Sequence, residues 1–253
     1  MHEPVSETNH GLIVPSGNEI LSIQLRPDGL SFAYTEKGEL RSFVVHIPVE
    51  KREAGFEYVF SRAEWPAKTF SSVRVCVPTD CAVLVPEDLN DQGQYGTLMT
   101  ALGYADDPGG HIFAQSCPGG KVLLHAVCET IIRPLTGRYG DALSFYHPLY
   151  VSLSQQEEKS TILRIDRAGG YGNFTLTNGG NLLFADVFPL ENEADLLLMV
   201  NRIIVSNKIG SFRIICSGEN SEANVAFLSL HYREVAVHPQ GEFRNLLYPF
   251  SCE

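Results

Sequence analysis

The sequence predicts a mixed α/β protein, with α+β mixed sheets, in which two halves each open with a three-stranded antiparallel meander. Residues 20–47 contain three strand-like runs separated by turn sequences, and residues 161–188 repeat this pattern. The turns contain glycine, and the runs between them are rich in β-branched and aromatic residues, as in hairpin-connected strands. Helix-like and strand-like segments then follow each meander, as in mixed α/β folds.

The two meanders align without a gap at an offset of 142 residues. Six of the twenty positions from 21 to 40 are identical, whereas unrelated sequences of ordinary composition give about one identity. We therefore predict an internal duplication, with two unrelated meanders as the alternative. The identical pairs are Leu21 and Leu163, Ile23 and Ile165, Phe32 and Phe174, Thr35 and Thr177, Gly38 and Gly180, and Leu40 and Leu182.

The rest of the first half predicts short strands and helices. Pro134 is expected to limit or kink one helix, because proline removes a backbone donor and its ring crowds the preceding turn. Strands are expected at residues 71–78, 81–86, 111–117, 121–127 and 141–145, and the strands at 111–117 and 121–127 are expected to form a hairpin. Helices are expected at residues 49–65, 88–103, 128–140 and 147–160, and the last of these is expected to run out to the surface.

The rest of the second half predicts a helix, a strand, a helix and a last short strand. Residues 189–209 begin with acidic residues and have Lys208 near their end, as the helix dipole favours. Leu196, Val200 and Ile203 fall on one face of this helix. The following elements are expected at residues 211–218, 221–234 and 235–238.

The composition indicates a globular protein that does not bind nucleic acid. The chain has 253 residues and a net charge of −11, which disfavours phosphate backbones and anionic lipid surfaces. The first ten residues lack the basic and apolar regions of a signal peptide. No apolar run approaches the roughly 20 residues of a membrane-spanning helix. We therefore expect a cytoplasmic protein without direct membrane insertion, whose six cysteines are free thiols.

Three stretches resemble an uncharacterised bacterial family, domain of unknown function 3822. They are LSIQLRPDGLSF at 21–32, the hairpin that begins TILRIDRAGG at 161, and residues 194–237. The resemblance implies an actin-like ATPase fold with two ribonuclease-H-like domains facing a cleft. We expect a loose N-terminal segment at residues 1–18, a first domain at 19–158 and a second domain at 159–253.

Active members of the actin-like superfamily bind ATP through three local devices, and the first is absent here. It is an Asp-x-Gly turn after the first strand, and this chain has Gln24, Leu25 and Arg26 at that position. Glutamine lacks the charge that holds a hydrated divalent cation. Arginine is bulky where glycine would let phosphate approach the backbone. The following Pro27-Asp28-Gly29 predicts an ordinary hairpin turn.

The second device, the matching turn of the second domain, is altered. Asp166 is kept, and the glycine is displaced to the pair Gly169 and Gly170. The amides of a glycine pair can form a nest that binds an anion such as phosphate. Aspartate and glycine are also the residues that a tight hairpin needs. Phosphate binding and a plain hairpin are therefore the two interpretations, and the hairpin is favoured.

The third device, a glycine-rich turn that admits the adenosine, is reduced to Ser217 and Gly218. Glu219 adds a negative charge on the phosphate side, which raises the cost of holding a triphosphate. The interpretation favoured here is structural, with Ser217, Asn220 or Ser221 capping the next helix. The candidate phosphate- or nucleotide-binding residues are thus Asp166, Gly169, Gly170, Ser217 and Gly218.

No other chemistry is indicated. The eight histidines have no recognisable base or metal partner by spacing, so no catalytic or metal-ligating set is predicted. His125 is expected to be a satisfied core histidine. His147 and His238 each precede a proline and are expected to mark element boundaries.

These residues favour a catalytically inactive, actin-like scaffold or assembly protein, a pseudo-ATPase that needs no cofactor and binds a protein partner, which includes a second copy of the chain. The alternative is a nucleotide-binding switch that resembles pilus-assembly or cell-division members of the superfamily. ATP and magnesium would then lie at Asp166, Gly169, Gly170 and Gly218. A third reading, a kinase-like enzyme or small-molecule binder, lacks a candidate base at the first-domain turn.

Overall fold

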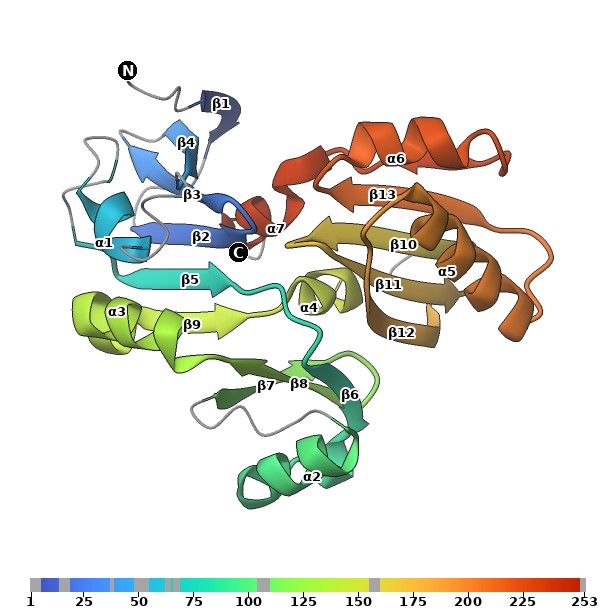
Figure 1. The fold of residues 1–253 in the computed structure, drawn as a ribbon, viewed down its shortest axis with the longest axis horizontal. Helices are drawn as coiled ribbons and strands as arrows, with labels where there is room; N and C mark the ends of the chain where they lie inside the picture. Colours follow the sequence, from blue (N-terminus) through green and yellow to red (C-terminus); the bar gives the residue numbers. More distant parts are fainter. Residues whose placement is uncertain are drawn as a thin grey trace. The chain divides into compact units, whose positions relative to one another are not determined.

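The computed structural model describes residues 6–13, 19–36, 39–47, 55–61, 65, 69–103, 110–154 and 160–250. The chain forms two compact units (Figure 1). Unit 1 comprises Met1–Val77, Cys128–Tyr146 and Leu246–Glu253, and unit 2 comprises Pro78–Val127 and His147–Asn245. The units do not follow the predicted boundary at residue 158, because residues 78–127 and the helix after His147 pack with the second half of the chain.

Unit 1 contains a six-stranded sheet with the order β1-β4-β3-β2-β5-β9. The predicted meander is present as β2, β3 and β4. The expectation of a loose segment at residues 1–18 is wrong for residues 6–13, which form β1 and pair antiparallel with β4. The strands are β1 Ser6–Ile13, β2 Ile20–Arg26, β3 Gly29–Glu36, β4 Glu39–His46, β5 Ser72–Cys76 and β9 Leu143–Tyr146.

The core of unit 1 is rich in aromatic side chains. Phe32 is fully buried, and its ring centroid lies 5.1 Å from that of Phe43 and 4.8 Å from that of Trp65. The helix expected at 49–65 is described only as α1, Gly55–Phe60. The helix expected at 128–140 is α3, Glu129–Tyr139, which continues through Pro134. The remaining helices here are η4 Gly140–Ala142 and η6 Tyr248–Phe250.

Unit 2 contains a five-stranded sheet with the order β12-β11-β10-β13-β14. The first three strands form the second meander. Strand β13 pairs parallel with β10 and β14 with β13, just as β5 pairs with β2 and β9 with β5 in unit 1. The strands are β10 Thr161–Ala168, β11 Tyr171–Asn178, β12 Asn181–Pro189, β13 Arg213–Gly218 and β14 Val235–Val237.

The first hairpins of the two meanders have the same register at the predicted offset of 142. Ile23 pairs with Phe32 in unit 1, and Ile165 pairs with Phe174 in unit 2. The register between the second and third strands differs by one residue over part of its length, because unit 2 has a bulge at Leu176/Thr177. Within the first hairpins, residues that are aligned by sequence identity therefore also have equivalent backbone pairing.

The two faces of the five-stranded sheet differ in polarity. Helices α5, Glu193–Ser206, and α6, Ser221–Leu228, cover an apolar face (Figure 1). Helix α4, Pro148–Leu153, packs on the opposite side. Side chains alternate along a strand, so this second side presents a row of buried polar groups: Arg164, Asp166, Asn173, Thr175, Thr177 and Ser217.

Helix α4 is buried, and the later polar residues 155–159, where the helix was expected to run out to the surface, lie outside the described residues. Leu149, Val151 and Leu153 are all buried. His147 caps this helix, as expected for an element boundary: its Nδ1 accepts a hydrogen bond from the Leu149 amide at 3.0 Å. The apolar side chains at the beginning of the segment thus explain why α4 is buried in unit 2.

A three-stranded sheet of order β6-β8-β7 completes unit 2. It confirms the hairpin predicted at residues 111–127. The helix predicted at 88–103 is divided into two 3₁₀ turns and a short α-helix, since glycines dilute its helical preference. The elements are β6 Ala82–Pro86, η2 Glu87–Leu89, η3 Gln92–Gln94, α2 Tyr95–Ala101, β7 His111–Cys117 and β8 Lys121–Val127; further along the chain lie η5 Gly241–Phe243 and α7 Arg244–Leu247.

No helix in the described part of the chain is long and apolar enough to cross a membrane.

Candidate functional site

The parallel pairing of β10 with β13 brings two of the predicted devices together. Asp166 is paired with Ser217, and Arg167 is paired with Gly218. The Ser217 hydroxyl donates a hydrogen bond to Asp166 Oδ2 at 2.7 Å. The end of β10 and the turn between β13 and α6 are thus neighbours, as the interpretation of both as parts of one site requires.

The Asp166 carboxylate is fully buried and bound by side chains of unit 2. Besides Ser217, Asn245 Nδ2 donates to Oδ1 at 2.7 Å, and Arg244 Nη1 lies 3.4 Å from Oδ2. The Asn173 amide donates to the backbone carbonyl of Asp166 at 3.0 Å. Asp166 therefore has an internal cation and two neutral donors at its carboxylate.

Arg244 is held by the same network. Its Nη1 donates to Ser152 Oγ at 3.0 Å and to Ser217 Oγ at 3.1 Å, and its Nη2 lies 3.4 Å from the Val151 carbonyl. Burial raises the pKa of Asp166 and lowers that of Arg244, and the opposite charge of the partner counteracts both shifts. The site thus ties β10 and β13 to α4 and to the first residues of α7.

Arg244, Asn245 and Ser152 were not among the residues predicted from the sequence. Arg244 and Asn245 lie 78 and 79 residues from Asp166 in the chain. The available signal was the polar pair Arg244-Asn245 in front of the apolar residues 246–250. Polar residues at the start of such a segment indicate a buried partner only when the fold is known.

The glycine pair forms a tight hairpin in which one amide already has an acceptor. Gly169 and Gly170 have φ values of 62° and 83°, in the left-handed region that glycine tolerates. The Gly169 amide donates to Glu219 Oε1 at 3.2 Å, and the Leu190 amide donates to the Gly170 carbonyl at 2.9 Å. A carboxylate of the chain therefore lies where an anion nest would place a phosphate.

Gly218 is required by close packing against β10. Its φ is 77°, and a Cβ at this position would lie 2.1 Å from the Arg167 carbonyl oxygen. The predicted side-chain cap of α6 is wrong for two of its three candidates. Asn220 occupies the N-cap position in a left-handed conformation without a side-chain cap bond, and the Ser217 hydroxyl binds Asp166.

The matching turn of unit 1 is a structural hairpin. Gln24 is buried, and its amide nitrogen has no hydrogen-bond partner among the described residues. Arg26 Nε lies 3.6 Å from Asp28 Oδ1, and His46 Nδ1 lies 2.7 Å from Asp28 Oδ2. The polar side chains around this turn therefore bind one another.

Magnesium-ATP does not fit the residues of unit 2 as they are arranged. A hydrated magnesium ion needs accessible carboxylate oxygens, whereas the Asp166 carboxylate is fully buried and bound by Arg244. A phosphate at the glycine pair would meet the Glu219 carboxylate at the Gly169 amide. Both internal groups would have to move before a nucleotide could bind here.

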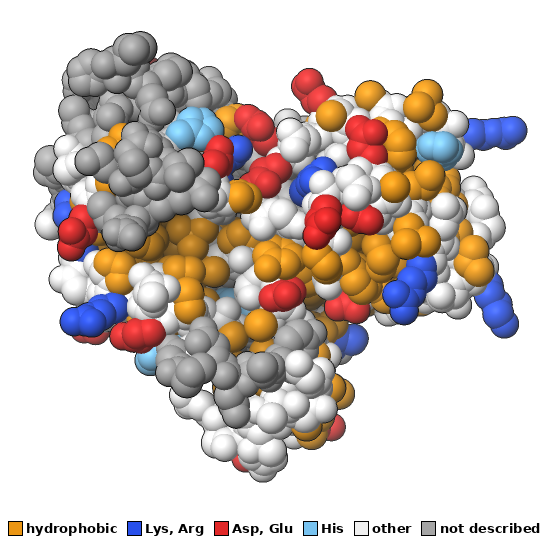
Figure 2. Space-filling model, viewed as in Figure 1, with side chains coloured by type: hydrophobic (Ala, Val, Ile, Leu, Met, Phe, Trp, Pro, Cys, Tyr) orange, Lys and Arg blue, Asp and Glu red, His pale blue; other side chains and the backbone are white. Residues whose placement is uncertain are grey.

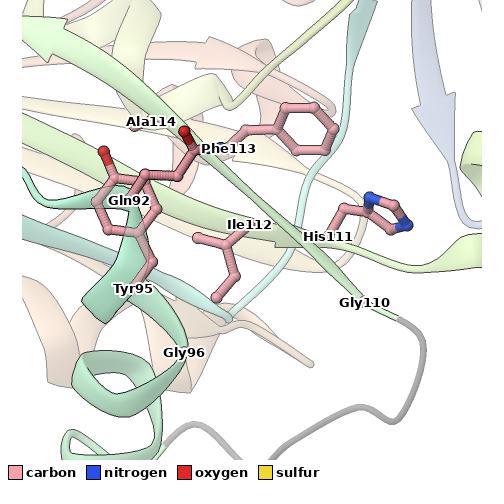
Figure 3. Close-up of a pocket in the computed structure, with 8 residues that line it drawn as sticks. All are labelled: Gln92, Tyr95, Gly96, Gly110, His111, Ile112, Phe113 and Ala114. Atoms are coloured by element: carbon pink, nitrogen blue, oxygen red, sulfur yellow. The ribbon is translucent and has the colours of Figure 1, made fainter.

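A pocket of unit 2 lies away from these residues. It measures about 660 Å³ and lies between η3–α2 and β7, with Tyr95 and Gln92 on the helical side and Ile112 on the strand (Figure 3). None of the predicted site residues lines it. The described residues also contain no group of three or more His, Cys, Asp or Glu side chains placed to bind a metal.

His125 is a core histidine, but it is not satisfied as expected. It is fully buried, and neither ring nitrogen has a hydrogen-bond partner among the described residues. Its ring centroid lies 5.7 Å from that of His147. Burial is the main cause that holds the pKa of His125 well below its usual value.

Comparison with known families gives one match that covers most of the chain. Residues 12–233 match the model of the family described as "Protein of unknown function (DUF3822)". None of the curated proteins matches the chain.

Several solved structures have a similar fold at low sequence identity. A Bacteroides thetaiotaomicron protein with an actin-like ATPase fold and unknown function has a TM-score of 0.78 and 14% identity, over 93% of this chain and 96% of that one. The PilM–PilN type IV pilus biogenesis complex gives 0.60 and 13%, over 92% and 98%. The ethanolamine utilization protein EutJ from Carboxydothermus hydrogenoformans gives 0.51 and 10%, over 94% and 92%. These similarities confirm the predicted actin-like ATPase fold.

Proposed function

We propose that this chain, which belongs to the family described as "Protein of unknown function (DUF3822)", is a catalytically inactive actin-like assembly protein that acts by binding protein partners. The observation that carries the proposal is the state of the Asp166 carboxylate. In a nucleotide-binding member this group would face a hydrated cation. Here it is fully buried and bound by Arg244, Ser217 and Asn245.

The charge of the site also supports this proposal. Arg244 supplies the positive charge that magnesium would supply, and it needs no nucleotide to hold it in place. Removing that guanidinium from Asp166 would leave a buried charge without compensation, which typically costs about 3–5 kcal/mol. A nucleotide would have to offset this cost before it could bind with useful affinity.

A role in assembly is supported by one structural relative. PilM, in the PilM–PilN type IV pilus biogenesis complex, has a similar fold and forms a complex with another protein. Protein binding needs only an exposed surface, and folds of this kind carry many unrelated functions on different surfaces.

Thermal unfolding with and without nucleotide tests the proposal. The melting temperature would be measured with no ligand, with magnesium alone, with magnesium-ATP and with magnesium-ADP. A ligand that binds only the folded state at a hundredfold excess over its Kd stabilises it by about 2.7 kcal/mol. We expect no shift with any of these ligands.

Two variants make the result specific. Asp166→Asn removes the charge at the site, and Asp186→Asn removes a carboxylate on β12 outside the network. Each is compared with its own ligand-free melting temperature. A nucleotide-dependent shift that Asp166→Asn abolishes and Asp186→Asn retains would overturn the proposal in favour of the nucleotide-binding switch.

A further inference from the structure

Helix α5 exposes apolar side chains on the face that points away from its sheet. Leu196, Val200 and Ile203 are buried against the sheet, whereas Leu198 is 64% exposed and Val205 is 75% exposed. Isolated exposed leucines are ordinary on soluble proteins. Here the two residues are seven apart, so they lie two turns apart on one face of the helix.

A third exposed leucine lies on the segment that packs beside α5. Leu230 is 78% exposed and follows α6. Two residues later, the Tyr232 hydroxyl donates to Asn201 Oδ1 at 2.9 Å, and Asn201 lies between Leu198 and Val205 on α5. We call the exposed face of α5 the α5 surface; its residues are Asp195, Leu198, Asn201, Arg202 and Val205, and Leu230 lies on the adjoining segment. Figure 2 shows hydrophobic side chains on this part of unit 2.

The charges of the α5 surface are placed on either side of Leu198. Asp195 precedes it by three residues and Arg202 follows it by four, so all three lie on one face of the helix. Asp195 Oδ2 accepts hydrogen bonds from the Glu191 and Asn192 amides, which fixes the carboxylate at the start of the helix. Arg202 is exposed. Burial raises the pKa of Asp186 in the same unit, and the positive charge of Arg202 acts in the opposite direction.

This arrangement is complementary to itself only when two helices run in opposite directions. In an antiparallel pair centred near Leu198, Asp195 of each copy lies beside Arg202 of the other. A parallel pair would place Asp195 beside Asp195 and Arg202 beside Arg202. A two-fold dimer uses the same patch on both copies, and it therefore requires this kind of self-complementarity.

We propose that the α5 surface binds a second copy of this chain through antiparallel α5 helices. The inference rests on the proposed function and names the partner in assembly as the chain itself. Helix α5 has 14 residues and is about 21 Å long. One pair of such helices with its neighbours buries less total surface than the roughly 1,200–2,000 Å² that stable complexes bury. The dimer is accordingly weak, with a Kd in the micromolar range.

Sedimentation equilibrium between about 1 and about 200 µM protein, without nucleotide, measures this association. We expect the wild-type chain to dimerise and Leu198→Glu to raise the dimer Kd at least tenfold. Leu183→Glu is the matched control, because Leu183 is exposed on β12 and lies outside the α5 surface. A wild-type chain that is monomeric throughout, or a Kd that Leu183→Glu raises as much as Leu198→Glu does, overturns the proposal.

Charge reversal tests the antiparallel arrangement without relying on the apolar residues. Arg202→Glu alone places two acidic groups together, and Asp195→Arg alone places two basic groups together, so each variant is expected to be monomeric. An equimolar mixture of the two variants restores both opposite-charge contacts and is expected to dimerise. A mixture as monomeric as its components overturns the proposal, provided that circular dichroism shows both variants folded.

The two proposals fail separately. A nucleotide-dependent thermal shift with an intact dimer removes the inactive assignment and leaves the α5 contact. The absence of both a nucleotide shift and a dimer leaves the inactive assignment and excludes a second copy at this surface.

Discussion

Asp166 has the identity expected of a phosphate-site aspartate but the environment of a structural one. Its oxygens accept from Ser217, Arg244 and Asn245, and no part of the side chain is exposed. Residue type alone therefore does not establish its role. The partners bear on it, because a carboxylate that is bound by an internal arginine has to lose that contact before it can hold a hydrated cation.

The Asp166–Arg244 pair should be strongly coupled in stability. Arg244→Ala leaves the buried carboxylate without its cation, and we expect it to lower the free energy of unfolding by about 3–5 kcal/mol. Asp166→Ala should also destabilise the protein, and the double variant should lose about 0.5–3 kcal/mol less than the sum of the single losses. Urea denaturation of the four proteins gives these values.

Arg213→Ala is the control for this cycle. Arg213 is exposed at the start of β13, so its removal should change the free energy of unfolding by no more than about 0.5 kcal/mol. Strictly additive losses at Asp166 and Arg244 would contradict the interpretation of the two as an ion pair.

His147 should make stability depend on pH between about 4 and 6.5. Burial lowers its pKa from 6.5 to about 4, while the hydrogen bond to the Thr79 backbone acts in the opposite direction. Its Nδ1 accepts from the Leu149 amide, and its Nε2 lies 2.9 Å from the Thr79 carbonyl, so the neutral ring fits both contacts. Protonation of Nδ1 would remove the cap of α4.

The direction of this effect follows from the lowered pKa. The unfolded chain takes up a proton near pH 6.5, whereas the folded chain resists until about pH 4. The stabilisation is therefore complete above pH 6.5 and is lost as the pH falls, by on the order of 3 kcal/mol in total. Urea denaturation across this range should show a smaller loss for His147→Asn, which can keep the cap without titrating. An equal loss in both proteins would contradict the assignment.

Among the elements, the turns and strand ends determine how the candidate site is assembled. The β10–β11 hairpin needs left-handed glycines, and the turn after β13 needs Gly218 because the Arg167 carbonyl lies against it. These requirements are met in a hairpin without a ligand. Glycine at these positions is thus explained by backbone geometry, whether or not a phosphate ever binds.

Replacing glycine with alanine should destabilise the protein at Gly218 and stabilise it at Gly137. Gly218→Ala adds a Cβ 2.1 Å from a backbone oxygen at a positive φ, and we expect a loss of about 3 kcal/mol in the free energy of unfolding. Gly137→Ala, in the exposed interior of α3 with open space around it, should gain about 0.5–1 kcal/mol. Thermal and urea unfolding compare the two, and equal effects would contradict this explanation.

At the scale of the whole molecule, the features that could be predicted from the sequence are those that depend on a local residue pattern or on identities between the two halves of the chain. The offset of 142 residues predicted which strand residues pair, and the first hairpins have that register. Residues 6–13 were expected to be loose because they are polar, yet β4 supplies an edge to which they pair. Arg244 could not be predicted to reach Asp166, because contacts across 78 residues depend on the packing of α4 and β13. Long-range polar contacts of this kind have no local pattern in the sequence.

Phe32 and Phe174 occupy equivalent places in two separate cores, and this provides a test of the whole molecule. Both rings are fully buried, one in unit 1 and the other in unit 2. Phe32→Ala and Phe174→Ala should each lower the free energy of unfolding by about 3–5 kcal/mol, because each leaves a cavity in a core. Since each unit has its own core, native-state hydrogen exchange should show faster opening mainly of β2–β4 in the first variant and of β10–β12 in the second. If both variants accelerated exchange equally throughout the chain, the two units would form one cooperative structure, and the duplication would have no counterpart in stability.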